Sequence, residues 1–157
     1  MNAAHIMTTK VAVTRCGKTV AEAMKLLSEE RIRQLPIVDE DNRVVGLLTS
    51  KKLLYLTLPR YIAEGLLKDV KFAPDLPQFH QRCAELAHKD VCEVMDKEFK
   101  KIGPEVSVME VATMFVSSEK PLECILVVDN QTRLLGIISP WDIFKKLCEY
   151  TEKTASK

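Results

Sequence analysis

The sequence predicts an α/β protein built from two copies of one unit, each containing a helix, two strands and a second helix in that order. Two observations support this prediction. Residues 19–54 and 107–144 repeat one another in order, at an offset of 88 to 90 positions. Each copy also closes on Arg, two aliphatic residues, Gly, two aliphatic residues and a hydroxyl residue, written RVVGLLT at 43–49 and RLLGIIS at 133–139.

The first helix of each copy is predicted by its opening residues. Thr19 is followed three positions later by Glu22, and Ser107 by Glu110. In this capping box the hydroxyl and the carboxylate each bond a backbone amide that the first helical turn leaves unpaired. Apolar residues then recur at helical spacing and give each helix one apolar stripe: Val20, Ala23, Met24 and Leu27 in the first copy, and Val108, Val111, Ala112 and Phe115 in the second.

Two strands follow each of these helices. The apolar runs LPIVD at 35–39 and ILVVD at 125–129 lead into polar turns, and then into the closing pattern. Two such runs predict an antiparallel hairpin buried by helices. We expect final helices to begin at residues 50 and 140, capped by Thr49 and Ser139. Short leading strands near 10–14 and 98–102 complete each copy.

The chain therefore divides into a first copy at 5–55, a helical connector at 56–90, a second copy at 91–150 and a polar tail at 151–157, which we expect to be frayed. Prolines in FAPDLP, residues 72–77, predict a break within the connector.

Composition excludes several classes of protein. With 23 basic and 22 acidic residues the net charge is +1, which provides no broad field for a nucleic-acid partner. A content of 46% hydrophobic and 29% charged residues is that of a globular domain. No apolar run approaches the roughly 20 residues that cross a bilayer, and MNAAHIMTTK lacks the pattern of a secretory signal, so we expect a cytoplasmic protein. The five cysteines are odd in number and widely spaced, which favours reduced, buried thiols.

These residues together resemble a pair of CBS domains, the family named after cystathionine β-synthase. The matching motifs are TVAEA or SVMEV, LPIVD or ILVVD, and GIISPWD, and they cover roughly residues 5–55 and 90–150. The resemblance implies two β-α-β-β-α units packed through their sheets about a pseudo-twofold axis, with two related clefts. It also implies a homodimer that binds AMP, ADP, ATP or S-adenosylmethionine as a regulatory ligand, with no required cofactor. Nothing in the family pattern implies catalysis.

The resemblance also assigns roles in the second cleft. Asp142 would accept hydrogen bonds from both ribose hydroxyls, which suits an ionised carboxylate. Ser139 could donate to the ligand, and Ile137 would border the nucleoside. The phosphate would be met by Arg33, whose guanidinium suits phosphate oxygens, and by Gln34. The adenine would lie among residues from the second copy: Ile102, Gly103, Val108, Leu122 and Glu123.

The first cleft is expected to be weaker. Thr49 keeps the hydroxyl, but Lys52 replaces the ribose acceptor with a cation that can only donate. Glu123 and Cys124, which would face this cleft, offer phosphate no positive partner. Lys52 could instead project its charge toward a triphosphate or a partner.

Each assignment has an alternative. Asp142 could simply cap its helix, because it lies three residues after Ser139. Arg33 could be a solvated helix-end charge and Lys52 a surface lysine. Trp141 could line a pocket or a dimer contact, but packing is the commoner role. The histidines and cysteines His80, Cys83, His88 and Cys92 would point to roughly 0°, −60°, 80° and 120° around a helix, too wide a spread for one zinc ion.

Three functions remain in competition. The leading hypothesis is a sensor that binds an adenosine nucleotide in the Asp142 cleft and signals to a partner protein. The second is a ligand-independent dimerisation module with vestigial clefts. The third is an enzyme that uses Cys92 or Cys124, although no nucleophile motif accompanies either thiol. The sequence leaves open which nucleotide binds, whether the dimer is parallel or antiparallel, and which process is regulated.

Overall fold

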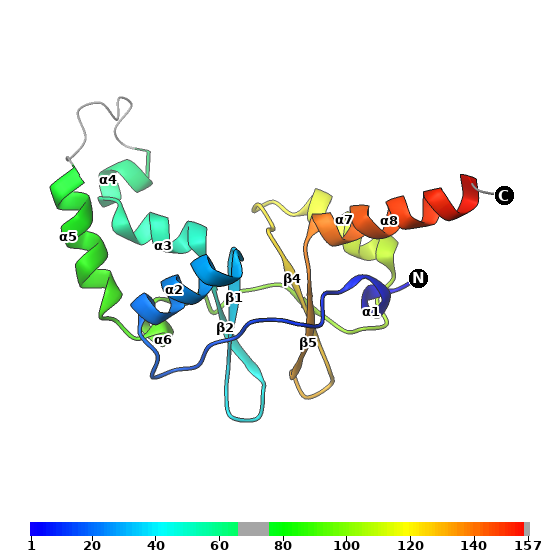
Figure 1. Cartoon of the computed structure of the whole chain (residues 1–157), viewed down its shortest axis with the longest axis horizontal. Helices are drawn as coiled ribbons and strands as arrows, with labels where there is room; N and C mark the ends of the chain where they lie inside the picture. The colour runs from blue at the N-terminus through cyan, green and yellow to red at the C-terminus, as the bar shows by residue number, and fades with distance from the viewer. Residues whose placement is uncertain (66–75, 156–157) are drawn as a thin grey trace. The chain divides into compact units, whose positions relative to one another are not determined.

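A computed structural model describes residues 1–65 and 76–155 and confirms the α/β class (Figure 1). The chain forms two compact units. Unit 1 consists of Met1–Val11, Glu40–Val44 and Glu98–Lys157, and unit 2 of Ala12–Asp39 and Val45–Lys97. Sequence repeats and compact units are thus different divisions of the chain, and the four-part division given above stays a prediction.

Unit 2 contains most of the first repeat, residues 19–54, except Glu40–Val44, which belong to unit 1. Helix α2 spans Val20–Glu30 and begins with the predicted capping box, in which Glu22 accepts a bond of 2.8 Å from the Thr19 amide. Strands β1 (Gln34–Val38) and β2 (Val44–Thr49) form a two-stranded sheet, and α3 spans Ser50–Thr57. One apolar core joins these elements through buried side chains that include Val20, Leu35, Ile37, Leu48 and Leu53.

Unit 1 contains the second copy. Helix α7 (Val108–Ser117) again starts with its capping box, and α8 spans Pro140–Ala155. The sheet has the order β3 (Lys101–Ile102), β4 (Ile125–Val128), β5 (Leu134–Ile138). Strand β3 runs parallel to β4, and β5 runs antiparallel to it. The predicted helices and hairpins of both copies are therefore confirmed.

The two leading strands differ in length for a physical reason. In unit 1, the Leu126 amide donates to the Lys100 carbonyl and extends the pairing of β3 with β4. The equivalent position in unit 2 is Pro36, which has no amide hydrogen to donate. The leading strand expected at 10–14 is accordingly reduced to a single parallel bridge between Thr14 and Ile37.

In each unit, a short segment that precedes the other copy's leading strand also pairs with the last strand of the hairpin. In unit 1, Thr8 and Ile137 of β5 exchange two backbone bonds of 2.9 and 3.0 Å. In unit 2, Asp96 and Leu47 of β2 exchange two bonds of 2.9 Å. Glycine is required where these segments cross, since a Cβ on Gly136 would lie 2.9 Å from the Thr8 carbonyl oxygen and a Cβ on Gly46 would clash with the side chain of Met95.

The connector contains helices α4 (Arg60–Ala63) and α5 (Leu76–Ala87), and the short helix α6 (Val91–Val94) follows it. Helix α5 packs against α2 and α3 in unit 2 (Figure 1). The break predicted at 72–77 lies largely outside the described residues. In the part of the chain that the structure describes, no helix has the length and hydropathy needed to cross a membrane.

The expectation of a frayed tail was wrong for residues 151–155, which continue α8. The hydroxyls of Thr151 and Thr154 donate to the carbonyls of Leu147 and Tyr150, at 2.9 and 3.1 Å. These polar side chains thus bond to the helix that they extend. The short helix α1 (Ala3–Ile6) lies at the other end of the chain and packs on α7, α8 and β5 within unit 1.

Candidate functional site

Asp142 lies in the first turn of α8, and its carboxylate already has three hydrogen-bond donors. One oxygen, Oδ2, accepts from the amide and the hydroxyl of Ser139, both at 2.7 Å. The other, Oδ1, accepts from the hydroxyl of Thr8 at 2.9 Å. The helix-capping role of Asp142 is confirmed, because its carboxylate bonds the amide that precedes the helix.

These contacts limit how Asp142 could bind a diol. A carboxylate offers about four acceptor positions, so one position on Oδ1 remains beside the three in use. A ribose diol brings two donors. One of the hydroxyls already bound, that of Thr8 or that of Ser139, must therefore rotate away for both ribose hydroxyls to bond Asp142.

The structure brings together several of the residues expected around the adenine. Ile102 is buried in the core of unit 1, and Val108 and Leu122 are half-buried against that same core. Gly103 follows β3, and a Cβ there would meet the Glu105 side chain. Ile137 is half-buried on β5, bonded to Thr8, the residue that donates to Asp142. Glu123 is half-buried just before β4.

The two residues expected to meet the phosphate belong to unit 2. Arg33 is exposed, and its carbonyl accepts from the Ser50 amide at 2.9 Å. Gln34 is half-buried at the start of β1. Their approach to a ligand held by unit 1 stays a prediction.

In the first copy, the residue equivalent to Asp142 is Lys52, and it forms an ion pair with Asp96. Thr49 caps α3 by accepting from the Lys52 amide at 3.0 Å, as expected. The Lys52 ammonium lies 3.1 Å from Oδ1 of Asp96, with 30% of the lysine side chain exposed. Lys52 therefore has an anionic partner within unit 2, and its role toward a triphosphate or a partner protein stays a prediction.

Thr8 and Asp96 were missed by sequence reasoning. They sit in equivalent places, because Thr8 pairs with Ile137 in unit 1 as Asp96 pairs with Leu47 in unit 2. The copy that has the acceptor Asp142 thus receives a hydroxyl donor, and the copy that has the cation Lys52 receives a carboxylate. Aligning Met7 with Met95 would have found both, since each changed residue directly follows its methionine.

The expectation that the cysteines are reduced and buried was wrong for three of them. Cys16 and Cys92 form a disulfide although 76 positions separate them, and Cys148 is exposed. Cys124 is buried as expected. Burial, followed by the charge of Glu123, raises the pKa of its thiol to about 12. A thiol of that pKa is almost entirely protonated at neutral pH, which argues against Cys124 as a nucleophile.

Trp141 and Cys92 also differ from expectation. Trp141 is 74% exposed, so it does not pack in the interior. Cys92 contributes to a group other than the one considered for zinc. Its sulfur lies with Cys16 and Asp90, whose ligand-type atoms are all within 4.8 Å of one another.

The fold and the duplicated helix starts define a tandem-repeat α/β module whose two copies differ at the equivalent residues Asp142 and Lys52. The chain belongs to the CBS domain family, whose model matches residues 3–58 and 91–149.

Solved structures show the same fold. An acetoin utilization protein (AcuB) from Vibrio cholerae has a TM-score of 0.75 and 18% identity, covering 100% of this chain and 97% of its own. CBSX2 in complex with AMP has a TM-score of 0.72 and 17% identity, covering 96% and 98%. The CBS domain pair of protein MJ0100 in complex with 5-methylthioadenosine and S-adenosyl-L-methionine has a TM-score of 0.66 and 23% identity, covering 96% and 98%.

A curated relative is much longer than this chain. Homoserine O-acetyltransferase of Methanococcoides burtonii is 27% identical over 140 residues, which is 89% of this chain but 23% of the relative. The chain thus spans about a quarter of that protein, and the similarity is not evidence of catalysis.

Proposed function

We propose that this protein is a non-catalytic regulatory module that binds an adenosine-containing nucleotide through Asp142 and signals its occupancy to a partner protein. The observation that supports this most strongly is the contrast between the copies. Asp142 keeps an acceptor position and two rotatable hydroxyl neighbours, whereas Lys52 is neutralised by Asp96.

The ligand class is supported by the structural relatives. CBSX2 was crystallised with AMP, and the MJ0100 domain pair with 5-methylthioadenosine and S-adenosyl-L-methionine. All three ligands contain adenosine, and adenosine presents the ribose diol that a carboxylate accepts. AMP, ADP, ATP and S-adenosylmethionine are therefore the candidates, with Arg33 and Gln34 assigned to any phosphate.

Calorimetric titration of these four ligands against the wild type and Asp142→Ala tests the proposal. We expect at least one ligand to bind the wild type and its affinity to fall at least about tenfold in the variant, because a hydrogen bond to a charged group contributes about 1.5–3 kcal/mol. Unchanged affinity in the variant would refute the role of Asp142, and failure of all four to bind the wild type would refute the sensor.

The control must match the structural damage of that variant, because Asp142 also caps α8. Glu22→Ala removes a carboxylate that bonds the amide and hydroxyl of Thr19, the equivalent contact at the start of α2. Both variants lose the carboxylate of a capping box, so both should be less stable than the wild type. The Glu22 variant should nevertheless match the wild type in nucleotide affinity.

A second function, dimerisation independent of ligand, is favoured by an apolar surface on unit 1. We define the α7–α8 face as Met109, Val116, Trp141, Phe144, Leu147 and Tyr150. All six are exposed, Val116 at 86% and Phe144 at 60%. The six side chains lie on two helices that pack together, and we assign this face to a second copy of the chain. Exposed apolar patches mark interaction surfaces. The cytoplasmic location and the identity of the effector stay predictions.

A further inference from the structure

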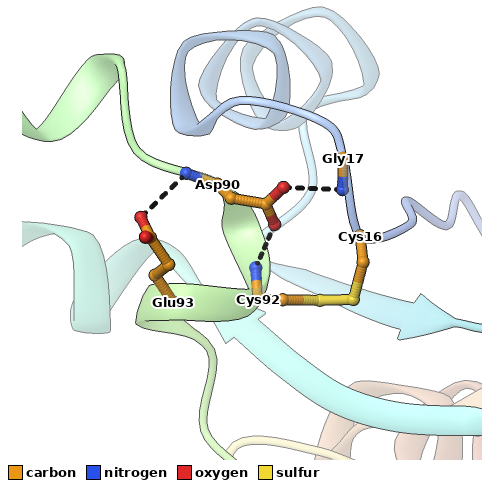
Figure 2. The surroundings of a disulfide bond; sticks show 5 residues. All are labelled: Cys16, Gly17, Asp90, Cys92 and Glu93. Atoms are coloured by element: carbon orange, nitrogen blue, oxygen red, sulfur yellow. Dashed lines mark hydrogen bonds between the residues drawn. A yellow bond between two sulfur atoms is a disulfide. The ribbon is translucent and has the colours of Figure 1, made fainter.

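The disulfide between Cys16 and Cys92 joins the loop that precedes α2 to the start of α6, both within unit 2 (Figure 2). The two Cα atoms lie 5.3 Å apart, in the range that a disulfide requires. The bond encloses most of unit 2, including the connector.

Backbone contacts hold these two segments together beside the disulfide. The Val20 amide donates to the Lys89 carbonyl at 2.8 Å, and the Val91 amide to the Lys18 carbonyl at 2.9 Å. The segments thus pair as neighbouring strands do, and Val91 is fully buried in the core. This pairing brings the segments that carry the two sulfur atoms close together.

Asp90 reinforces the same junction. One carboxylate oxygen accepts from the Gly17 amide at 2.7 Å, and the other from the Cys92 amide at 2.8 Å (Figure 2). The Asp90 amide in turn donates to Glu93 at 3.2 Å. A junction fixed by this many contacts gives two thiols a high effective concentration toward each other, which favours closure of a disulfide.

The two sulfurs differ in access. Cys16 is exposed and Cys92 is half-buried. A small thiol can therefore reach the Cys16 sulfur without unfolding of the core. Thiol–disulfide exchange requires attack of a thiolate on one of the two sulfur atoms.

We propose that Cys16 and Cys92 are a reversible thiol–disulfide exchange site whose redox state controls the stability of the first copy. Oxidation by a low-molecular-weight disulfide proceeds in two steps. The Cys16 thiolate attacks that disulfide and releases one small thiolate, leaving a mixed disulfide. The Cys92 thiolate then attacks the Cys16 sulfur and releases the second. The protein pair loses two electrons to the small disulfide, and the two protons of its thiols pass to the released thiolates.

The effect reaches the Lys52 position through a short, defined path. Helix α6 ends at Val94, and Met95 and Asp96 follow it directly. The Met95 amide donates to the Val91 carbonyl at 3.0 Å. Asp96 pairs with Leu47 and holds Lys52. Oxidation therefore fixes Cys92, which lies four residues before Asp96, the residue that neutralises Lys52.

Equilibration of the full-length protein with mixtures of reduced and oxidised glutathione, followed by alkylation and mass spectrometry, tests this proposal. We expect the Cys16–Cys92 bond to form and break reversibly without denaturant. Reduction should lower the melting temperature by about 10 °C, because it removes a cross-link that closes a loop of 76 positions in the unfolded chain. It should also speed hydrogen exchange at the amides of Asp96 and Leu47, with the Ile137 amide of unit 1 unchanged.

A variant with Cys83, Cys124 and Cys148 replaced by Ser is the matched control, and it should keep the whole response. Cys16→Ser should abolish the response and give the melting temperature of the reduced protein. Three results would overturn the proposal. They are a bond that resists excess reduced glutathione, thiols that stay reduced in oxidised glutathione, and a thiolate-to-metal absorption band when Co²⁺ is added to the reduced protein, which would make the cluster with Asp90 a metal site.

Discussion

Asp142 and Lys52 occupy equivalent positions in the two copies, and each is paired by a residue from a segment that precedes the leading strand. The reversal of charge between them is therefore matched by a second change, from Thr8 to Asp96. A hydroxyl leaves Asp142 available to another donor, whereas a carboxylate satisfies the charge of Lys52. The pair of changes, rather than either alone, makes the two sites unequal.

This matching predicts how the first copy responds to substitution. Lys52→Asp alone places two carboxylates where an ion pair 3.1 Å long now stands, and it should destabilise the protein. Adding Asp96→Thr recreates the arrangement of the second copy and should restore the free energy of unfolding to within about 1 kcal/mol of the wild type, since a part-exposed pair contributes little.

A double-mutant cycle measured by denaturant unfolding checks this expectation. Asp96→Thr alone completes the cycle, because it leaves Lys52 without its anion. Additive effects of the two substitutions would contradict the matched pairing.

Cys124 gives a second prediction at the level of a single residue. Burial raises the pKa of its thiol to about 12, so the reactive thiolate is scarce at neutral pH. With the disulfide intact, an aromatic disulfide reagent should label the exposed Cys148 quickly and Cys124 only after unfolding. Cys148→Ser should remove a fast phase of labelling, while Cys124→Ser should leave the native kinetics unchanged.

Among the elements, the two capping boxes are the clearest link between sequence and structure. The Glu22 carboxylate accepts from the Thr19 amide, and this bond lowers the pKa of Glu22 below its ordinary value of 4.5. The hydroxyl of Ser107 does most to lower the pKa of Glu110 in the same way. Both helices therefore start with a carboxylate that the fold keeps ionised.

These lowered pKa values predict a loss of stability in acid. Because each folded-state pKa lies below the unfolded one, the unfolded chain binds protons first as the pH falls. The stabilisation is complete above about pH 5 and is lost as the pH falls below about 4.5 through the folded values. Replacing both residues with Gln should flatten the pH dependence of the unfolding midpoint between about pH 5 and pH 3.

The measurement is chemical unfolding at several pH values. Glu29→Gln is a suitable comparison, because that carboxylate lies at the other end of α2 in an exposed pair with Lys25. If the doubly substituted protein and the wild type lose stability in parallel, the capping carboxylates do not cause the acid sensitivity.

Local signals predicted these elements because each depends on neighbours in sequence. The capping boxes, the apolar runs and the hydroxyl of Thr49 lie within a few residues of the structure that they determine. The Ser139 hydroxyl instead donates to Asp142, whose carboxylate bonds the Ser139 amide. The leading strand of the first copy was overestimated, because its length depends on Pro36 of β1, which it meets only in the folded sheet. The length of α8 was underestimated from its polar composition.

The candidate site was predictable to the extent that it follows the repeat. Asp142, Ser139 and Ile137 lie in one continuous motif, and the structure places them together. Thr8 was missed because it is 134 positions from its partner Asp142. The disulfide was missed because the spacing of Cys16 and Cys92 has no meaning until Thr19 and Asp90 pair.

At the scale of the whole molecule, the α7–α8 face predicts self-association. Val116 and Phe144 are 86% and 60% exposed, on two helices that pack together in unit 1. Val116→Lys combined with Phe144→Lys should convert a particle of twice the chain mass into one of the chain mass, as measured by light scattering. Burial of such side chains contributes about 1.5–3 kcal/mol each, and lysine removes that gain.

Leu76→Lys is the matched control, because Leu76 is 63% exposed at the start of α5 and lies outside this face. It should leave the mass unchanged. A wild type that scatters as a single chain at micromolar concentration would exclude a stable homodimer.

The composition of unit 1 also constrains the order of folding during translation. Residues 1–11 leave the ribosome before any of unit 2, but their partners, β5 and α8, are made after unit 2. Unit 2 is nearly continuous in sequence, so it can fold before residues 1–11 find their partners. Thr8 can bond Asp142 only after the residues through α8 have emerged, so a segment made before unit 2 is placed after it.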